Sequence, residues 1–100
     1  MKLNVLERII LSNILPKQGN FTNLKIVRTV SEKLSFDEEE NAKLEFRQDG
    51  DQMRWNSIDI VKDIELGSVA TALIVKELIK MDKEEKLTIE HYSLCEKFLN

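Results

Sequence analysis

The sequence predicts an α+β fold in which helices predominate: one domain of about five helices with one β-hairpin. Apolar residues recur every three or four positions in several segments, which is the period of an amphipathic helix. Residues 44–48 and 52–56 instead alternate apolar and polar side chains around Gly50, which is typical of a hairpin. A chain of 100 residues has the usual length of one domain, so we expect residues 1–100 to fold as a unit.

The composition is that of a globular protein with one modest core. Hydrophobic residues make up 42% and charged residues 33% of the chain, which fits neither a disordered nor a fibrous protein. Cys95 is the only cysteine, so we expect a small buried thiol in a reducing compartment rather than a disulfide. Glu7 and Arg8 interrupt the first apolar run, unlike a signal peptide, and no run is long enough for a membrane span. The expected location is the cytoplasm, without a membrane partner.

Two long helices and a short one are predicted in the first half. Helical spacing begins at Leu3, and Pro16 ends that helix near residue 14. Thr22 is the expected cap of a second helix that continues to residue 34. Ser35 is the expected cap of a short third helix, with an acidic and solvated first turn at residues 37–40.

The second half starts with the hairpin and ends with two helices. Leu44 and Phe46 are expected to face Met53 and Trp55, with Trp55 in the core. Residues 57–66 fit either a loop or a loop with a third short strand. Further along the chain, Gly67 or Ser68 is expected to start a helix that packs against the first one, and Thr88 to cap the last helix.

The residues that carry chemistry are too few for an enzyme, a metal site or a cofactor site. Zinc needs about four cysteine or histidine ligands, whereas the chain has Cys95 and His91 alone. The three glycines are far apart, so no phosphate-binding loop is predicted. Residues 82–93 lack the glycine and the final glutamate of a calcium loop. We therefore predict no cofactor and a function that is not enzymatic; a hydrolase that uses two facing carboxylates is the least favoured alternative.

A winged helix is the runner-up fold, because its order is also helix, helix, short helix and hairpin. In that fold the third helix enters the major groove, but here it would carry four acids, which repel phosphates. DNA binding is therefore disfavoured, although Lys25, Arg28 and Lys33 could support it through another geometry.

The charge is unevenly distributed, which favours recognition of another protein. Residues 1–34 carry six basic and two acidic side chains, a net +4, and the remainder of the −3 total gives residues 35–100 a net −7. The first and fourth predicted helices are broadly apolar, which also makes a homodimer an expectation. The expected partner contacts are the exposed charges of the second and third helices: Lys25, Arg28, Lys33, Asp37, Glu38, Glu39 and Glu40.

Five segments of the chain also resemble a known group of proteins. They are residues 3–11 and 14–21 at the start, 46–48 and 53–56 in the middle, and 94–98 at the end. They are similar to segments of short uncharacterised proteins encoded by tailed phages and prophages of Gram-positive bacteria. The resemblance covers nearly the whole chain but brings no functional residues with it. It implies a phage accessory protein in the host cytoplasm, acting as an inhibitor or adaptor on a host or phage partner.

Overall fold

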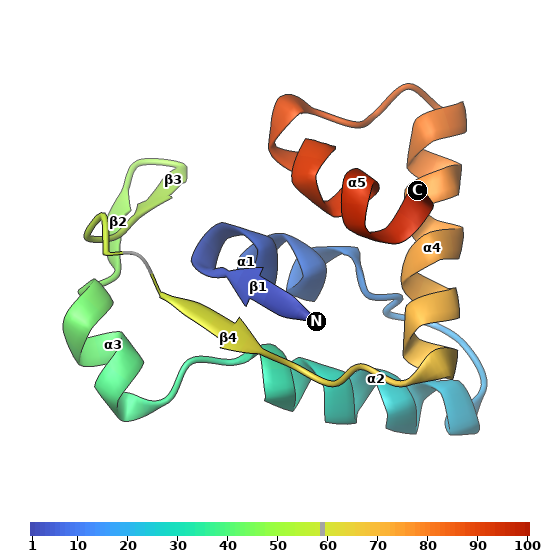
Figure 1. Cartoon of the computed structure of the whole chain (residues 1–100), viewed down its shortest axis with the longest axis horizontal. Coiled ribbons are helices and arrows are strands. Elements are labelled where there is room, and N and C mark those ends of the chain that lie inside the picture. Colours follow the sequence, from blue (N-terminus) through green and yellow to red (C-terminus); the bar gives the residue numbers. More distant parts are fainter. Residues whose placement is uncertain (59) are drawn as a thin grey trace.

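Helix α1 (Val5–Ile14) lies at the centre of the fold, with the other elements arranged around it (Figure 1). The computed structural model describes residues 1–58 and 60–100. Within these residues it confirms an α+β fold with five α-helices and two small antiparallel sheets. The other elements are β1 (Lys2–Asn4), α2 (Phe21–Leu34), α3 (Glu38–Leu44), β2 (Arg47–Asp49), β3 (Gln52–Arg54), β4 (Val61–Asp63), α4 (Ser68–Lys83), a 3-10 turn (Ile89–His91) and α5 (Tyr92–Leu99).

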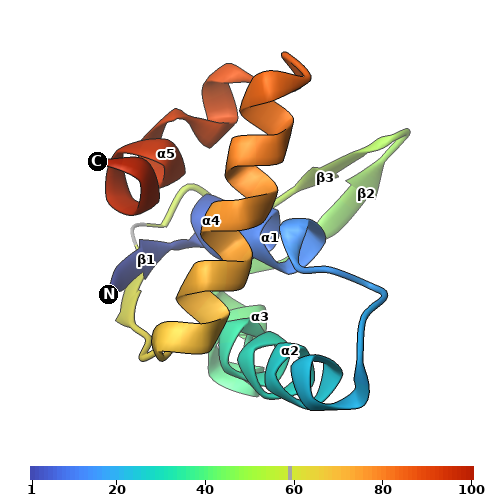
Figure 2. The same ribbon diagram turned by 90° about the vertical axis from the view of Figure 1, so that its right-hand side faces the viewer.

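The core forms where α1, α2, α4 and α5 meet. Figure 2 shows α4 crossing in front of α1, with α5 on one side and α2 below. The helix predicted to start at Gly67 or Ser68 is α4, and its predicted packing against the first helix is confirmed. Among the described residues, no helix is long and apolar enough to cross a membrane. The buried side chains of this core are Leu3, Ile10, Leu11, Leu15, Val30, Leu34, Ile64, Leu66, Ala70, Ile74, Leu78 and Leu94.

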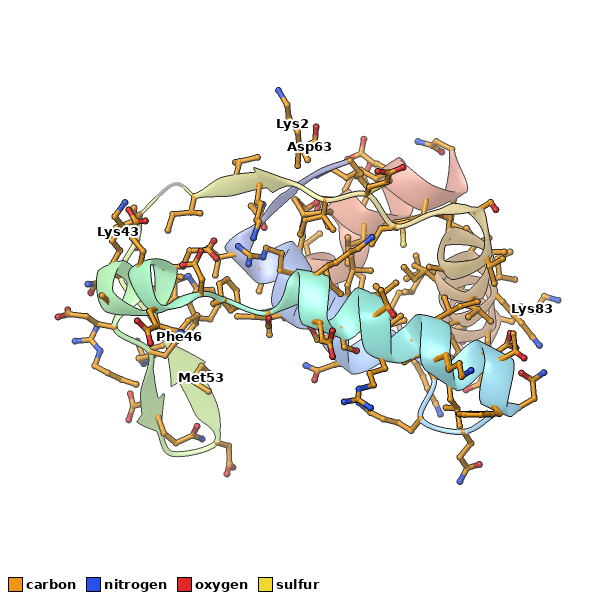
Figure 3. The ribbon with its side chains drawn as sticks, turned by 90° about the horizontal axis from the view of Figure 1, so that it is seen from below. Lys2, Lys43, Phe46, Met53, Asp63 and Lys83 are labelled. Atoms are coloured by element: carbon orange, nitrogen blue, oxygen red, sulfur yellow. The ribbon has the colours of Figure 1, made fainter. Side chains whose placement is uncertain are left out.

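The chain begins with a strand, which corrects the predicted start of the first helix. β1 pairs with β4 in antiparallel register, with Lys2 opposite Asp63, and these two side chains lie next to each other in Figure 3. The third strand left open by the sequence therefore exists, but it pairs with the N-terminus and not with the hairpin. Local periodicity could not reveal this pairing, because the partners are about 60 residues apart.

Two predicted helix caps are wrong, and both true caps are nearby. Asn20, not Thr22, begins α2: its side-chain oxygen accepts a hydrogen bond from the Asn23 amide at 2.8 Å. Ser35 ends α2 instead of beginning α3, because its hydroxyl donates to the Glu32 carbonyl at 2.6 Å. Asp37 caps α3 and forms a capping box with Glu40.

A hairpin with its turn at Gly50 is confirmed, with Arg47 opposite Arg54. Its first strand is shorter than predicted, because Leu44 is the last residue of α3, and Met53 lies opposite Gln48 instead. The Phe46 ring packs on Trp55 at 5.9 Å between centroids, and Figure 3 places Phe46 where α3 joins the hairpin. Trp55 is half-buried and Met53 half-exposed, so this cluster is a small satellite of the core rather than part of it. The order of α1, α2, the seven-residue α3 and a separate two-stranded hairpin is the order that the winged-helix alternative expects.

Of the two predicted starting positions, Ser68 is the first residue of α4 and Gly67 is its N-cap residue, with φ 83° and ψ 163°. This backbone region is open essentially to glycine alone and costs other residues about 1–3 kcal/mol. We expect Gly67→Ala to lower the free energy of unfolding by that amount, measured by urea denaturation. Gly19→Ala is the control, because Gly19 has no positive φ and its added Cβ would meet Asn23 at 3.9 Å. Equal effects of the two changes would contradict this explanation.

Candidate partner-binding site

The structure separates the seven predicted contact residues into distinct places. Lys25 and Lys33 line one groove between α2 and the start of α4. Arg28 lies outside the groove lining and pairs with Glu32 at 3.5 Å, with both side chains exposed. The four acids belong to α3 and its cap, and none of them lines this groove.

The hollow between the two helices, here called the α2–α4 groove, has a volume of about 360 Å³. The first turn of α4 stands next to α2 on one side of the molecule (Figures 1 and 2). The residues that line the groove are Lys25, Ile26, Thr29, Val30, Lys33, Leu66, Gly67, Ser68, Val69 and Ala70. Most of the lining surface is therefore apolar, with the lysines as its only charged side chains.

The spacing of α2 explains why two lysines flank an apolar floor. Lys25, Thr29 and Lys33 follow each other at four-residue intervals, so they form one row along the helix. Ile26 and Val30 form the neighbouring row, which turns toward α4. Opposite them Gly67 has no side chain. Val69 remains 48% exposed, so its apolar side chain is open to solvent.

Both lysines keep a charge that no acid in the described part of the chain neutralises. The Lys25 ammonium lies 4.5 Å from the centroid of the exposed Phe21 ring. The Lys33 ammonium donates to the Glu65 carbonyl at 2.9 Å, which holds it beside the groove. Neither forms an ion pair with a described carboxylate, and the first turn of α4 carries no acid. The groove therefore combines an apolar floor with positive potential.

The acidic turn of α3 is not simply solvated, because Glu40 is bound inside the protein. Arg8, which is fully buried on α1, donates from Nη1 and Nη2 to the two Glu40 oxygens at 2.5 and 3.1 Å. The prediction that Glu40 is an exposed contact is therefore wrong. Glu38 and Glu39 do remain exposed, and Glu39 pairs with Lys43 at 3.1 Å.

Arg8 joins three segments and so fixes where α3 lies. Besides Glu40, its Nε donates to the Leu34 carbonyl at 3.3 Å and its Nη2 to the Ser35 carbonyl at 2.6 Å. Its guanidinium lies 4.1 Å from the centroid of the Phe36 ring. These contacts satisfy the last carbonyls of α2, which otherwise lack partners at a helix end. The Phe36 ring in turn packs on Phe46 at 5.1 Å between centroids. Arg8 is thus an anchor for α2, for α3 and, through Phe36, for the aromatic side chains beside the hairpin.

Glu7, the neighbour of Arg8, anchors the C-terminal helix. Its side chain is 2% exposed, and its Oε1 accepts from Lys97 Nζ at 2.7 Å and from the Asn4 amide at 3.0 Å. Lys97 also donates to the Lys2 carbonyl at 2.8 Å, so it joins α5 to β1 and α1. Asn4 and Glu7 form a capping box, and their spacing was the sequence signal that could have identified this cap.

Acid should destabilise the protein through the carboxyl groups of Glu7, which is buried, and Glu40, which is partly buried. Burial opposes ionisation of Glu7, but hydrogen bonds from Lys97 and Asn4 outweigh it and lower its pKa. The hydrogen bonds from Arg8 lower the pKa of Glu40 against the effect of burial. Groups with a lowered pKa add stability above their unfolded pKa, about 4.3, and lose it as the pH falls through the folded pKa.

We therefore expect the melting temperature to hold between neutral pH and about pH 5 and to fall steeply below about pH 4. Calorimetry across this range measures it. In Glu40→Gln the fall should be shallower, because one of the two carboxyl groups no longer titrates. A melting temperature that stays constant down to about pH 3 would contradict the role of these two groups.

Cys95, expected to be buried, is only partly buried against the core, and His91 belongs to the 3-10 turn before α5. Burial, with a smaller contribution from Asp82, raises the pKa of the Cys95 thiol, which disfavours the reactive thiolate. His91 Nδ1 accepts a hydrogen bond from the Thr88 amide at 3.0 Å. Thr88 thus caps the last helical segment as predicted, but through the 3-10 turn that precedes α5.

Comparison with known proteins adds no relative. No protein-family model matches the chain, and no curated protein or solved structure is significantly similar to it.

Proposed function

We propose that this chain is a small non-enzymatic protein-binding module of the cytoplasm, and that the α2–α4 groove receives its partner. The observation that carries the proposal is a groove with an apolar lining, at which Val69 is 48% exposed, beside two lysines that pair with no described acid. Exposed apolar surface with a polar rim is typical of sites where proteins meet. The resemblance to short phage proteins implies an inhibitor or adaptor with a host or phage partner.

The groove favours a protein over a nucleic acid. Binding of a duplex requires several cations along the phosphates, whereas this groove has two and an apolar floor that offers phosphates nothing. A duplex that extended from the groove as far as α3 would be repelled by the exposed Glu38 and Glu39. A nucleic-acid-binding regulator is therefore the alternative function, and the same experiment tests it.

The homodimer expected from the sequence depends on how much apolar surface the long helices leave exposed. The broad apolar face of α1 is explained within one chain, because β1, α2 and α4 all pack on it. Helix α4 leaves Val69 and Ile79 partly exposed, so of the two helices expected to carry a homodimer interface α4 remains the candidate.

Photocrosslinking at the groove tests the proposal. A photoreactive amino acid replaces Val69, and the protein is irradiated in a lysate of a Gram-positive bacterium; a discrete protein adduct is expected. Thr29→Trp, which fills the groove from an exposed position, should abolish that adduct. Thr22→Trp is the matched control and should keep the adduct, because Thr22 is also an exposed threonine of α2 but does not line the groove.

Each other outcome has a defined meaning. An adduct with twice the mass of the chain would show that the partner is a second copy. An adduct that nuclease removes would replace the proposal by nucleic-acid binding. An adduct that survives Thr29→Trp, or no adduct at all, would contradict a protein partner in this groove.

A further inference from the structure

We infer that the segment held in the α2–α4 groove is an amphipathic helix that carries two acidic residues seven or eight positions apart, with an apolar side chain between them. This inference rests on the proposed function and specifies the partner of the same site. It follows from three features of the groove: the sign of its charge, the distance between its lysines and the place of its apolar floor.

The sign of the charge selects an acidic partner. Lys25 and Lys33 are the charged side chains of the lining, and no described acid pairs with either. Burying an ammonium group under a neutral partner would cost solvation energy without compensation. A carboxylate placed beside each lysine removes that cost, whereas a basic segment would be repelled by both.

The spacing of the lysines sets the spacing of the acids. The two residues are eight positions apart on one helix, which corresponds to about 12 Å along the axis of α2 at 1.5 Å per residue. A second helix lying along α2 matches this distance with acids at positions i and i+7 or i+8, which also fall on one face. An extended strand would instead need acids three or four positions apart.

The floor requires an apolar residue between the acids. The apolar lining comes from both helices. On α2, Ile26 and Val30 lie between Lys25 and Lys33 along the helix, and α4 contributes Val69 and Ala70. Val69 is the most open of these apolar contacts. A leucine or isoleucine at position i+3 or i+4 of the bound helix would cover it, as apolar anchors do when a helix binds in a groove.

Selection from two displayed libraries of randomised peptides, one helical and four turns long and one extended, tests the inference. Enrichment from the helical library is expected, and enrichment of extended peptides alone would contradict the helix. The intact protein serves as bait. Enriched peptides should carry the acidic pair with the apolar residue between its members. The best peptide should bind the Lys25→Gln/Lys33→Gln variant roughly tenfold more weakly in fluorescence anisotropy, as expected for two exposed ion pairs. It should also lose affinity as salt is raised.

Two controls make this assignment specific. Lys17→Gln/Lys43→Gln removes the same charge from exposed positions outside the groove and should leave binding within twofold. A charge exchange should restore binding: Lys25→Glu/Lys33→Glu should prefer the same peptide with lysines in place of its two acids. Thermal unfolding of every variant checks that the fold is kept.

Several results would overturn the inference. These are enrichment of basic or uncharged peptides, enrichment of no peptide, or acidic peptides whose affinity is unchanged in Lys25→Gln/Lys33→Gln. Displacement of the peptide by a short DNA duplex at equal concentration would also overturn it. If the selection fails while the Val69 adduct is lost in Thr29→Trp, the groove binds a protein and only the acidic helix is wrong.

Discussion

Replacing Arg8 with methionine should lower the free energy of unfolding by about 3–5 kcal/mol, the usual effect of removing one partner of a buried ion pair. The change removes both bonds to Glu40 and leaves the Leu34 and Ser35 carbonyls without their donor. Because Arg8 is the link from α1 to α3, amide protons of α3 and the hairpin should exchange much faster. Urea denaturation and hydrogen exchange measure the two effects.

An exposed arginine provides the matched control for Arg8. Arg28→Met breaks the pair with Glu32, where both side chains are largely exposed, and should cost no more than about 0.5 kcal/mol. Arg8→Lys should fall between the two, because lysine keeps the charge but cannot bond both Glu40 oxygens and two carbonyls at once. An Arg8→Met variant as stable as Arg28→Met would contradict the anchoring role.

Replacing Lys97 with methionine is expected to have the second largest effect, about 3 kcal/mol. It leaves the Glu7 carboxylate buried without a cation, and the second oxygen of Glu7, Oε2, already has no hydrogen-bond partner among the described residues. The double variant Lys97→Met/Glu7→Gln should recover part of the loss, because it removes the buried charge. Denaturant titration of the two variants measures the difference.

Lys86→Met serves as the control for this second prediction. Lys86 pairs with Glu84 at 3.0 Å at an exposed turn, so its replacement should change stability by less than about 1 kcal/mol. A double variant of Lys97 and Glu7 less stable than Lys97→Met alone would show that the buried charge is not what makes the single change costly.

The parts of the fold that depend on neighbouring residues could be predicted from the sequence. The start of α4 after Gly67, the hairpin around Gly50 and the end of α1 before Pro16 each follow from glycine, proline or periodicity within a few positions. The misplaced caps show the limit of such signals. Thr22 and Ser35 have the right chemistry, but Asn20 and Asp37 have it too, and only the folded backbone decides between them.

The parts that depend on distant residues could not be predicted. β1 pairs with β4 across about 60 residues, and three residues are too few to show a strand period. Glu7 and Arg8 look like solvated charges that interrupt an apolar helix, whereas both are buried because their partners, Lys97 and Glu40, arrive from far along the chain. Buried charges of this kind carry no local sequence signal.

The candidate site was half predictable. The sequence identified Lys25 and Lys33 as exposed charges of α2, and the structure places both beside one groove. It could not identify the opposite wall, because Leu66 to Ala70 reach α2 only through the tertiary fold. Nor could it separate these lysines from Arg28, whose side chain pairs with Glu32 one turn further along the helix.

An NMR titration with the best acidic peptide tests the central claim most directly, because it reports where on the protein the peptide binds. The account predicts that the largest amide shift changes fall at residues 25–33 and 66–70, and that Lys25→Gln/Lys33→Gln reduces them at the same peptide concentration. Changes centred on the hairpin or on α5, with residues 25–33 unaffected, would contradict binding in the α2–α4 groove.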